Sequence, residues 1–506
     1  MPEDRRQPPD VAENPEAVGY QDRLTVEADT VVPPAALVRR GWAASTFESF
    51  RYRDFALFWS GALVSNVGTW MQNAALAIVV LFIDRAHVSF NTGIVQGVSG
   101  LPVLFLAIPA GAVADRVDRR KLLIWIQVVL LVQAAAVGIL YDLKVIGPWQ
   151  PLLSIVLVAV LGLIGGIFVA FQGPAFQSML PDLVPRKSLM NGIALNSAQL
   201  QSSRMLGPAI VAGMLLVGAG LGLVFYMNAA SFLFVIAALL AIRPRPEFRA
   251  GHGAEAARNP REAPGTGPAR LGSVEVAEAE NAWHTLTAGI AYAREHQAIG
   301  ILIITTALLV FLGFPYVIIL TAVISSRIPG LTNGQVERYY SIVYAFNGMG
   351  ALIGSLGVAG LPATIKRNRI IPLSLVAFSV LIIAFSFAPK PGVMIALTTL
   401  AGAAYITTSS LIMTSIQAAV PGYLRGRVMA LFMMAFMGVM PLSAFAFGPL
   451  GQVIGPDKAV LIGGVLLLFW ALVLVARPSW LKPIENPGLP GAAAAASAGA
   501  PAARAS

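Results

Sequence analysis

The chain has 506 residues, of which 57% are hydrophobic and 12% carry a charge. Soluble domains carry a charge on about 25% of their residues, so this composition and a mean hydropathy of +0.73 exclude a soluble globular protein. Because there is no cysteine, disulfides, thiolate metal sites and cysteine nucleophiles are excluded as well.

The N-terminal segment, residues 1–53, is polar and rich in Pro, Asp, Glu and Arg. It lacks the short apolar core that follows the basic start of a cleavable signal peptide. We therefore expect a disordered cytoplasmic tail, with the first apolar span as the uncleaved insertion signal. At the other end, the Ala-, Gly- and Pro-rich segment 478–506 predicts a second tail of low complexity.

Between these tails, apolar stretches recur twelve times. A helix needs about 20 apolar residues to cross a hydrocarbon core of roughly 30 Å. The stretches hold no Lys, Arg, Asp or Glu apart from Arg204, and they cover 55–83, 86–114, 122–141, 152–173, 189–217, 222–242, 298–320, 339–359, 370–388, 393–416, 428–447 and 459–476. The predicted fold class is all-α integral membrane, with twelve transmembrane helices.

Basic residues are unevenly distributed over the loops. The five loops on the side of residues 116–121 hold 18 Lys and Arg, whereas the opposite loops hold 6. The positive-inside rule places the richer side, and with it both termini, in the cytoplasm. The net charge of +10 is thus a topology signal, which makes the lipid bilayer the expected partner and gives no indication of nucleic-acid binding.

The longest polar interruption divides the spans into six and six. It predicts a first half at 54–242, a cytoplasmic linker at 243–297 and a second half at 298–477, with a short amphipathic helix near 283–299 at the end of the linker. The halves repeat one pattern, because Val184-Pro185 is followed by Gly207-Pro208, and Val420-Pro421 by Gly448-Pro449. Two related six-helix halves are typical of secondary transporters.

The loop between the second and third spans carries the most specific motif. Gly111-Ala-Val-Ala-Asp115-Arg116-Val-Asp118-Arg119-Arg120 resembles the signature Gly-x-x-x-Asp-Arg-x-Gly-Arg-Arg of the major facilitator superfamily, with Asp118 at the position of the second glycine. Together with Phe55 to Gln72 and Phe176 to Pro185, it is similar to the branch of the enterobactin exporter and macrolide efflux proteins. The resemblance extends from about Phe50 to Arg477 and implies the major facilitator fold with two pseudo-symmetric halves.

The motif has two interpretations. A carboxylate after a helix end, followed by fixed cations, can form a charge cluster that either joins adjacent helices or lets them part. The register with the family favours this conformational switch, in which Asp115 faces a helix N-terminus and Arg119 or Arg120 pairs with acids. The alternative is a positive-inside anchor without a switching role.

The fifth span combines a kink with a deep charge. Gly207-Pro208, followed by Gly213, resembles the Gly-Pro element of the superfamily's exporters, and Gly448-Pro449 stands at the matching place in the second half. Arg204 lies roughly 22 Å from the helix start at 1.5 Å per residue. It either attracts an anionic or electron-rich group of a substrate, or it stabilises carbonyls freed by Pro208.

Polar and aromatic residues at helical spacing complete the candidate site. The candidates for a substrate cavity are Asn66, Trp70, Asn73, Gln172, Asn196, Gln199, Arg204, Tyr344, Asn347, Tyr405 and Thr408. Such residues also join helices to one another. No Asp or Glu lies deep in a span, so the candidates for proton coupling are Asp54, Asp84 and Glu337 at span ends.

The resemblance implies a bacterial inner-membrane exporter of siderophores or macrolide-like drugs that works by alternating access and proton antiport. The sequence holds no phosphate-binding loop and no cluster of metal ligands, so we expect no enzyme activity, cofactor or metal. Two alternatives stay open: a facilitator or importer of a small metabolite, and a membrane receptor or structural partner that transports nothing.

Overall fold

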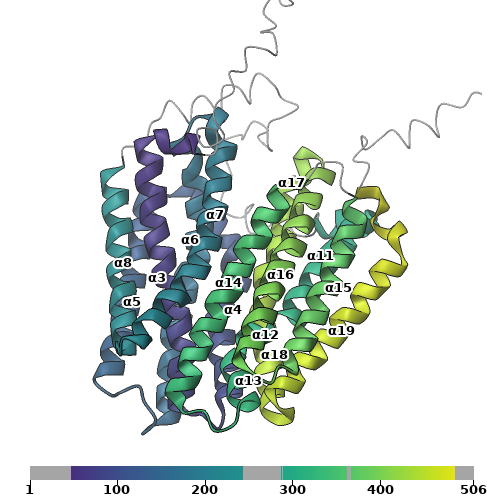
Figure 1. Cartoon of the computed structure of the whole chain (residues 1–506). Helices are drawn as coiled ribbons and strands as arrows, with labels where there is room; N and C mark the ends of the chain where they lie inside the picture. Colours follow the sequence, from purple (N-terminus) through teal and green to yellow (C-terminus); the bar gives the residue numbers. More distant parts are fainter. Residues whose placement is uncertain (1–46, 243–286, 288, 362–365, 485–506) are drawn as a thin grey trace, which may run out of the picture. The chain divides into compact units, whose positions relative to one another are not determined.

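All regular elements are helical in the computed structural model, which describes residues 47–242, 287, 289–361 and 366–484. From Ser49 onward these residues belong to a single compact unit. A 3-10 turn, η2 (Glu48–Arg51), precedes the first long helix. The six long helices of the first half are α3 (Arg53–Ile83), α4 (Val88–Arg116), α5 (Arg119–Asp142), α6 (Pro151–Leu183), α7 (Arg186–Leu216) and α8 (Leu221–Ala241) (Figure 1).

The second half has six spans, of which two are interrupted. Its helices are α11 (Gln297–Gly313), α12 (Pro315–Ile318), α13 (Leu320–Arg327), α14 (Asn333–Ala359), α15 (Arg367–Ser386), α16 (Pro391–Ala419), α17 (Gly422–Met433), α18 (Val439–Ile454) and α19 (Pro456–Ala476). The seventh span comprises α11 to α13, and the eleventh comprises α17, the π-helical turn η3 (Met434–Gly438) and α18. The predicted all-helical membrane fold is confirmed.

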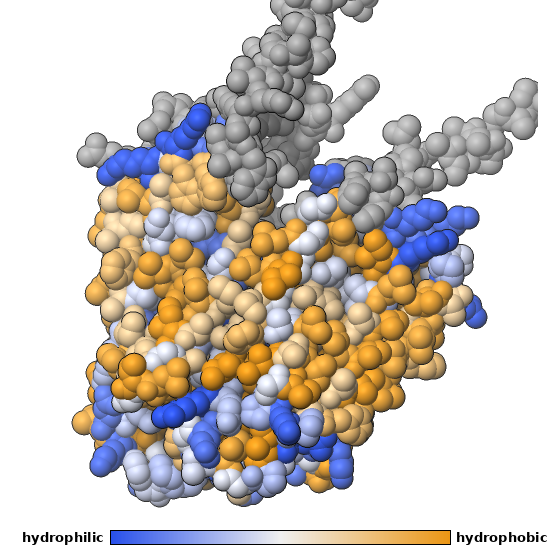
Figure 2. Space-filling model, in the orientation of Figure 1, coloured by the Kyte–Doolittle hydropathy of each residue, from blue (hydrophilic) through white to orange (hydrophobic). Residues whose placement is uncertain are grey.

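Eleven described helical segments are long and apolar enough to cross a membrane. The remaining long helix, α7, is less apolar because Gln199, Ser203 and Arg204 lie within it. Figure 2 shows a broad hydrophobic band across the visible face, with hydrophilic residues gathered at its upper and lower edges. This surface fits a bundle whose solvent at mid-height is lipid.

The bundle has two ends, which we name by residues. At the Asp84 end, α3 ends and α4 begins; at the Arg119 end, α5 begins and α8 ends. The halves meet along two helix pairs, α4 with α18 and α7 with α14. Glycines permit these approaches: a Cβ atom on Gly93 would lie 2.6 Å from the Cα of Gly448, and one on Gly348 would lie 2.7 Å from the carbonyl oxygen of Arg204.

Several sequence expectations need correction in detail. The seventh span, predicted as one stretch at 298–320, is broken at Phe314 and Ile319, where Pro315 starts the short helix α12. In the eleventh span the irregular turn is not at Gly448-Pro449, which lies inside α18, but at η3. Pro441 follows η3 and cannot donate a backbone hydrogen bond to the carbonyl of Met437, which accounts for a departure from α-helical bonding there.

Parts of the predicted C-terminal tail and linker lie within the described residues. The C-terminal tail was expected from residue 478, but η4 (Pro478–Ile484) continues the packed body and buries Leu481 completely. In the predicted amphipathic helix, residues 289–295 are helical, and Ile290 and Ala293 pack against the core. The predicted tail residues 1–46, the linker residues 243–286 and the tail beyond 484 lie outside the described residues.

Candidate functional site

The centre of the candidate site is Arg204, which α7 places at the interface of the halves. Its side chain is 7% exposed. One guanidinium nitrogen, Nη2, donates to Oδ1 of Asn347 on α14 over 3.4 Å. The guanidinium carbon lies 5.6 Å from the ring centroid of Trp70 on α3 and 5.9 Å from that of Phe314. Both halves therefore surround the cation, which is further stabilised by the faces of aromatic rings.

Asn347 links this cation to the second half. Its Nδ2 donates to the Tyr316 hydroxyl over 2.6 Å and to the carbonyl of Thr398 over 3.1 Å. The ring of Tyr316 is held edge-on by Phe378 and Phe385, with centroids 5.9 Å and 6.1 Å away. The amide oxygen of Asn347 is thereby fixed toward Arg204, because both of its amide hydrogens are used on the other side.

The positive charge of Arg204 is not neutralised within the part of the chain that the structure describes. No described carboxylate forms an ion pair with it, and its Nε has no hydrogen-bond partner there. Earlier on α7, the buried side chains of Gln199 and of Ser203, which directly precedes Arg204, also lack partners among the described residues. Buried polar groups are normally satisfied by protein or water, so this strip of α7 retains hydrogen-bonding capacity for water or a ligand.

Other predicted cavity residues lie around the same centre. Trp70 meets Tyr344 edge-on with centroids 6.4 Å apart, and Tyr405 lies 5.8 Å from Phe314, the ring that also faces Arg204. Thr408 is different, since its hydroxyl donates to Ser374 of α15 over 2.8 Å and joins two helices. The remaining candidates are half-buried: Asn66, Asn73, Gln172 and Asn196.

Sequence reasoning missed two groups of residues. Phe314 and Tyr316 flank Pro315 at the break in the seventh span, and that proline was the available signal. A chain of amides inside the first half was also missed: Asn228 donates to Gln72 over 2.8 Å, and Gln72 donates to Gln133 over 3.1 Å. These three amide side chains belong to α8, α3 and α5. The spacing of residues along a single span therefore does not reveal that they are hydrogen-bonded to one another.

The predicted glycine and proline elements serve mainly as close contacts. A Cβ atom on Gly207 would lie 2.5 Å from Cβ of Trp70, so α7 approaches α3 beside the ring that faces Arg204. Pro208 and Pro449 lie within α7 and α18. Gly448 packs against Gly93, whereas no atom lies within 4 Å of a Cβ placed on Gly213.

At the Arg119 end, the described contacts of the signature loop stay within the first half. Asp118 is the N-cap of α5 and accepts from the backbone amides of Arg120 and Lys121. Arg119 donates to the carbonyl of Ser178 over 2.9 Å and lies 3.5 Å from Asp182. Gly111 is half-buried, and the side chains of Asp115 and Arg116 lie outside the described ones.

Among the contacts that the structure describes, those of Arg120 are with backbone carbonyls. Its Nε and Nη2 donate to the carbonyls of Leu239 and Leu240 over 2.6 Å and 2.7 Å, at the C-terminus of α8. A cation is favourable there because the last carbonyls of a helix lack partners and carry its negative dipole end. Of the two arginines predicted to pair with acids, Arg119 has a described acidic neighbour, Asp182.

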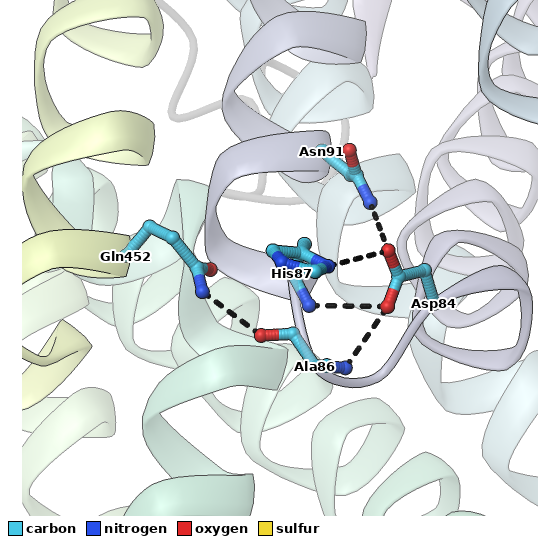
Figure 3. A network of polar contacts seen from close by, with 5 residues as sticks. All are labelled: Asp84, Ala86, His87, Asn91 and Gln452. Carbon is cyan, nitrogen blue, oxygen red and sulfur yellow. Dashed lines mark hydrogen bonds and ion pairs between the residues drawn. The ribbon is translucent and has the colours of Figure 1, made fainter. Parts of the chain in front are cut away.

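At the Asp84 end, a polar turn joins α3 to α4 (Figure 3). Asp84 accepts from the backbone amides of Ala86 and His87, and its other oxygen lies 2.8 Å from Nδ1 of His87 and 3.4 Å from Nδ2 of Asn91. Burial raises the pKa of Asp84, but the hydrogen bonds from His87 and Asn91 outweigh burial and leave the pKa below its ordinary value of 3.8. Asp84 is thus ionised at neutral pH.

The same turn connects the two halves. Gln452 of α18 donates to the carbonyl of Ala86 over 2.9 Å, as Figure 3 shows, and Ser89 donates to the carbonyl of Gly448 over 3.0 Å. Arg85 donates to Ser325 over 3.2 Å and to Asn333 over 2.8 Å. These contacts close the Asp84 end of the interface.

The other two carboxylates proposed for coupling lie at opposite ends of the bundle. Asp54, in the first turn of α3, is 8% exposed and lies 3.9 Å from Arg53. Glu337, near the start of α14, is 9% exposed. Asp84 and Glu337 therefore share one end, and Asp54 lies at the other.

Comparison with known proteins agrees with this architecture. The sequence profile of the transmembrane secretion effector family matches residues 44–250 and 270–486. The chain belongs to this family of major facilitator superfamily transporters. It is 25% identical over 414 residues to a staphyloferrin A transporter of Staphylococcus aureus, covering 81% of this chain and 92% of that protein. Over 186 residues it is 27% identical to the uncharacterised transporter YfiS of Bacillus subtilis, covering 37% and 41%.

Solved structures share the fold at low sequence identity. The crystal structure of a D-xylose–proton symporter superposes with a TM-score of 0.61 at 11% identity and covers 84% of this chain and 97% of that one. A bacterial homologue of the human lysosomal transporter Spinster, in an inward-facing and occupied conformation, gives 0.54 at 15% identity and covers 86% and 95%. The protein is therefore a transporter of the major facilitator fold.

Proposed function

We propose that this transporter exports a small amphipathic compound with an anionic or electron-rich group, by alternating access and in exchange for protons. The observation that carries the proposal is the buried Arg204, whose charge meets no acid among the described residues but faces aromatic rings and the Asn347 amide. A buried cation is costly unless a partner compensates it. A substrate anion is the partner that this site lacks.

The chemistry of the surroundings defines the class of compound. Trp70, Phe314, Tyr344 and Tyr405 offer apolar faces near the guanidinium, so a substrate with rings or acyl chains besides its anionic group fits them. Siderophores and macrolide-like drugs combine these properties to different degrees. The likeness to a staphyloferrin A transporter supports the siderophore type.

The location of the site suggests how binding is coupled to movement. Arg204 belongs to the first half, and Asn347, Phe314 and Tyr405 belong to the second, so a substrate held between them contacts both halves. Rocking of the halves about this centre exchanges access between the two ends. We assign the Arg119 end to the cytoplasm of a bacterial inner membrane from the excess of Lys and Arg in its loops.

Transport into and out of proteoliposomes tests the proposal. Purified protein is reconstituted with an imposed pH gradient, and uptake of staphyloferrin A is compared with that of an uncharged macrolide. We expect gradient-driven transport of the anionic compound and loss of most of it in Arg204→Gln. Arg425→Gln, which removes an exposed arginine, serves as the matched control and should transport normally.

Each result has a defined meaning. Transport that ignores the pH gradient would contradict antiport and indicate a facilitator. If Arg204→Gln impairs the charged and the uncharged compound equally and lowers the melting temperature, Arg204 is structural. Absence of flux for both compounds and for other siderophores would favour a receptor or structural role.

A further inference from the structure

A pocket of about 270 Å³ lies at the Asp84 end, separate from the Arg204 centre. The first half contributes Phe82, Tyr141, Leu215 and the turn 218–221, and the second half contributes Gly334, Glu337 and Arg338. Because both halves form its walls, the pocket exists only while the Asp84 end is closed. The surroundings of the residues that line it must therefore change when the halves separate.

Glu337 is the acidic group that lines this pocket. Its side chain is 9% exposed, and the charge of the neighbouring Arg338 acts on it. Burial removes part of the hydration of this carboxylate, and the positive charge of Arg338 compensates for only part of that loss. Closing the Asp84 end around Glu337 therefore disfavours its charged form and favours binding of a proton.

The other charged or titratable residues around the pocket do not take over this role. Arg338, the next residue, is exposed, and its positive charge favours the charged form of Glu337. Tyr141 comes from the opposite half, with Asp142 next to it at the end of α5. The walls from α3, α7 and α8 are apolar, with Phe82, Leu215 and Leu221. Asp84, in the nearby turn, is ionised at neutral pH because its hydrogen bonds lower its pKa.

A polar row leads from Glu337 toward Arg204 along α14. Ser341, Tyr344 and Asn347 follow Glu337 at i+4, i+7 and i+10, which places them on one face of the helix. Ser341 is fully buried and its hydroxyl has no partner among the described residues, while Asn347 contacts Arg204. This row provides hydroxyl and amide groups between the pocket and the centre of the bundle.

We infer that Glu337 is the site that binds the exchanged proton, which enters from the open Asp84 end, favours closure of that end, and leaves toward the Arg119 end when the substrate binds at Arg204. This inference rests on the proposed antiport. The linkage works in both directions: a proton on Glu337 stabilises the closed Asp84 end, and opening this end hydrates the carboxylate and favours loss of the proton. Low pH therefore favours closure, and high pH favours opening.

Distances measured without substrate test this linkage directly. Spin labels are attached to cysteines at Leu152 and Val453, exposed positions on α6 and α18 in a chain without cysteine. When the pH is raised from about 5.5 to about 8.5, we expect the fraction of molecules with the longer label-to-label distance, in which the Asp84 end is open, to rise about fivefold or more. Glu337→Gln, which cannot lose a proton, should stay closed throughout, and Glu337→Asp should respond with a shifted midpoint.

A matched control addresses the imidazole side chain at this end, that of His87. His87→Gln removes the ring beside Asp84 and should keep the pH response of the distance. A pH response that survives in Glu337→Gln, or that disappears in His87→Gln alone, would overturn the inference. So would a wild-type distance that does not change with pH.

Transport measurements distinguish a failure of this inference from a failure of the proposed function. In Glu337→Gln, gradient-driven transport should fall about tenfold or more, while exchange of labelled for unlabelled substrate at equal pH continues. Asp457→Asn, which removes a carboxylate that pairs with Arg327 inside the second half, should keep gradient-driven transport. If the wild type shows no gradient dependence, antiport itself fails; if Glu337→Gln keeps the wild-type dependence, only the assignment of Glu337 fails.

Discussion

The two ends of the bundle use polar side chains in different ways. At the Asp84 end, Arg85, Ser89 and Gln452 form hydrogen bonds from one half to the other. At the Arg119 end, Asp118, Arg119 and Arg120 form the described bonds within the first half. The first set holds the halves together, and the second set holds one half rigid.

This difference matches what the proposed alternating access requires. A neutral hydrogen bond contributes about 0.5–1.5 kcal/mol, so a few bonds across the Asp84 end can close it without making it permanent. A half that moves as a rigid body, in contrast, needs contacts that persist while the two ends open and close. The following predictions test whether the two sets have these separate roles.

The largest effect is expected from filling the glycine contact at the closed end. Gly93→Ala would place a Cβ atom 2.6 Å from the Cα of Gly448, and overpacking of this kind costs about 1–3 kcal/mol. We expect the Asp84 end to open and transport to fall about tenfold. Gly213→Ala, where no atom lies within 4 Å, is the control. Equal transport in both variants would contradict the role of this contact.

A smaller shift is expected from the arginine that bridges the halves. Arg85→Gln removes its hydrogen bonds to Ser325 and Asn333, which together contribute about 1–2 kcal/mol at an exposed site. Accessibility of a cysteine placed at Tyr141 to a thiol reagent should rise about fivefold. The melting temperature should change little, because each half keeps its own contacts.

The opposite result is expected at the Arg119 end. Arg120→Gln removes two hydrogen bonds to the C-terminus of α8, which should lower the free energy of unfolding by about 1–2 kcal/mol. The balance between open and closed Asp84 ends should stay as in the wild type. A changed balance with unchanged thermal stability would mean that Arg120 belongs to the switch.

The smallest effect concerns the pH dependence of the polar turn. The pKa of Asp84 is lowered in the folded protein, so its stabilising contribution is complete above about pH 4 and is lost as the pH falls through the folded value. The melting temperatures of wild type and Asp84→Asn should therefore converge below about pH 4. A difference that grows on acidification would contradict the hydrogen-bonded, ionised carboxylate.

Much of the fold followed from local properties of the sequence. Stretches free of charge except for Arg204 located the twelve spans. The depth of Arg204 and the spacing of Trp70, Tyr344 and Asn347 pointed to the centre of the candidate site. Tyr316 was missed because its contact with Asn347 depends on the break at Pro315, which hydropathy does not resolve. Contacts between distant residues, such as those of Arg85, depend on how the halves meet.

The roles of similar residues were equally dependent on tertiary contacts. Arg119 and Arg120 are adjacent in sequence, yet one lies beside Asp182 and the other caps α8. Thr408 had the spacing of a cavity residue, but the position of α15 gives its hydroxyl a partner in Ser374. Helical periodicity identifies a face, and only packing determines what that face meets.

The most direct test of the account measures both ends of the bundle in the same background. Spin-label pairs at Leu152 with Val453 and at Lys121 with Arg425 report on the Asp84 end and the Arg119 end, respectively. In wild type the Asp84 pair should show the short, closed distance. In Gly93→Ala this distance should lengthen while the Lys121–Arg425 distance shortens. If the two distances change in the same direction, or neither changes, the halves do not rock about Arg204 and the account is wrong.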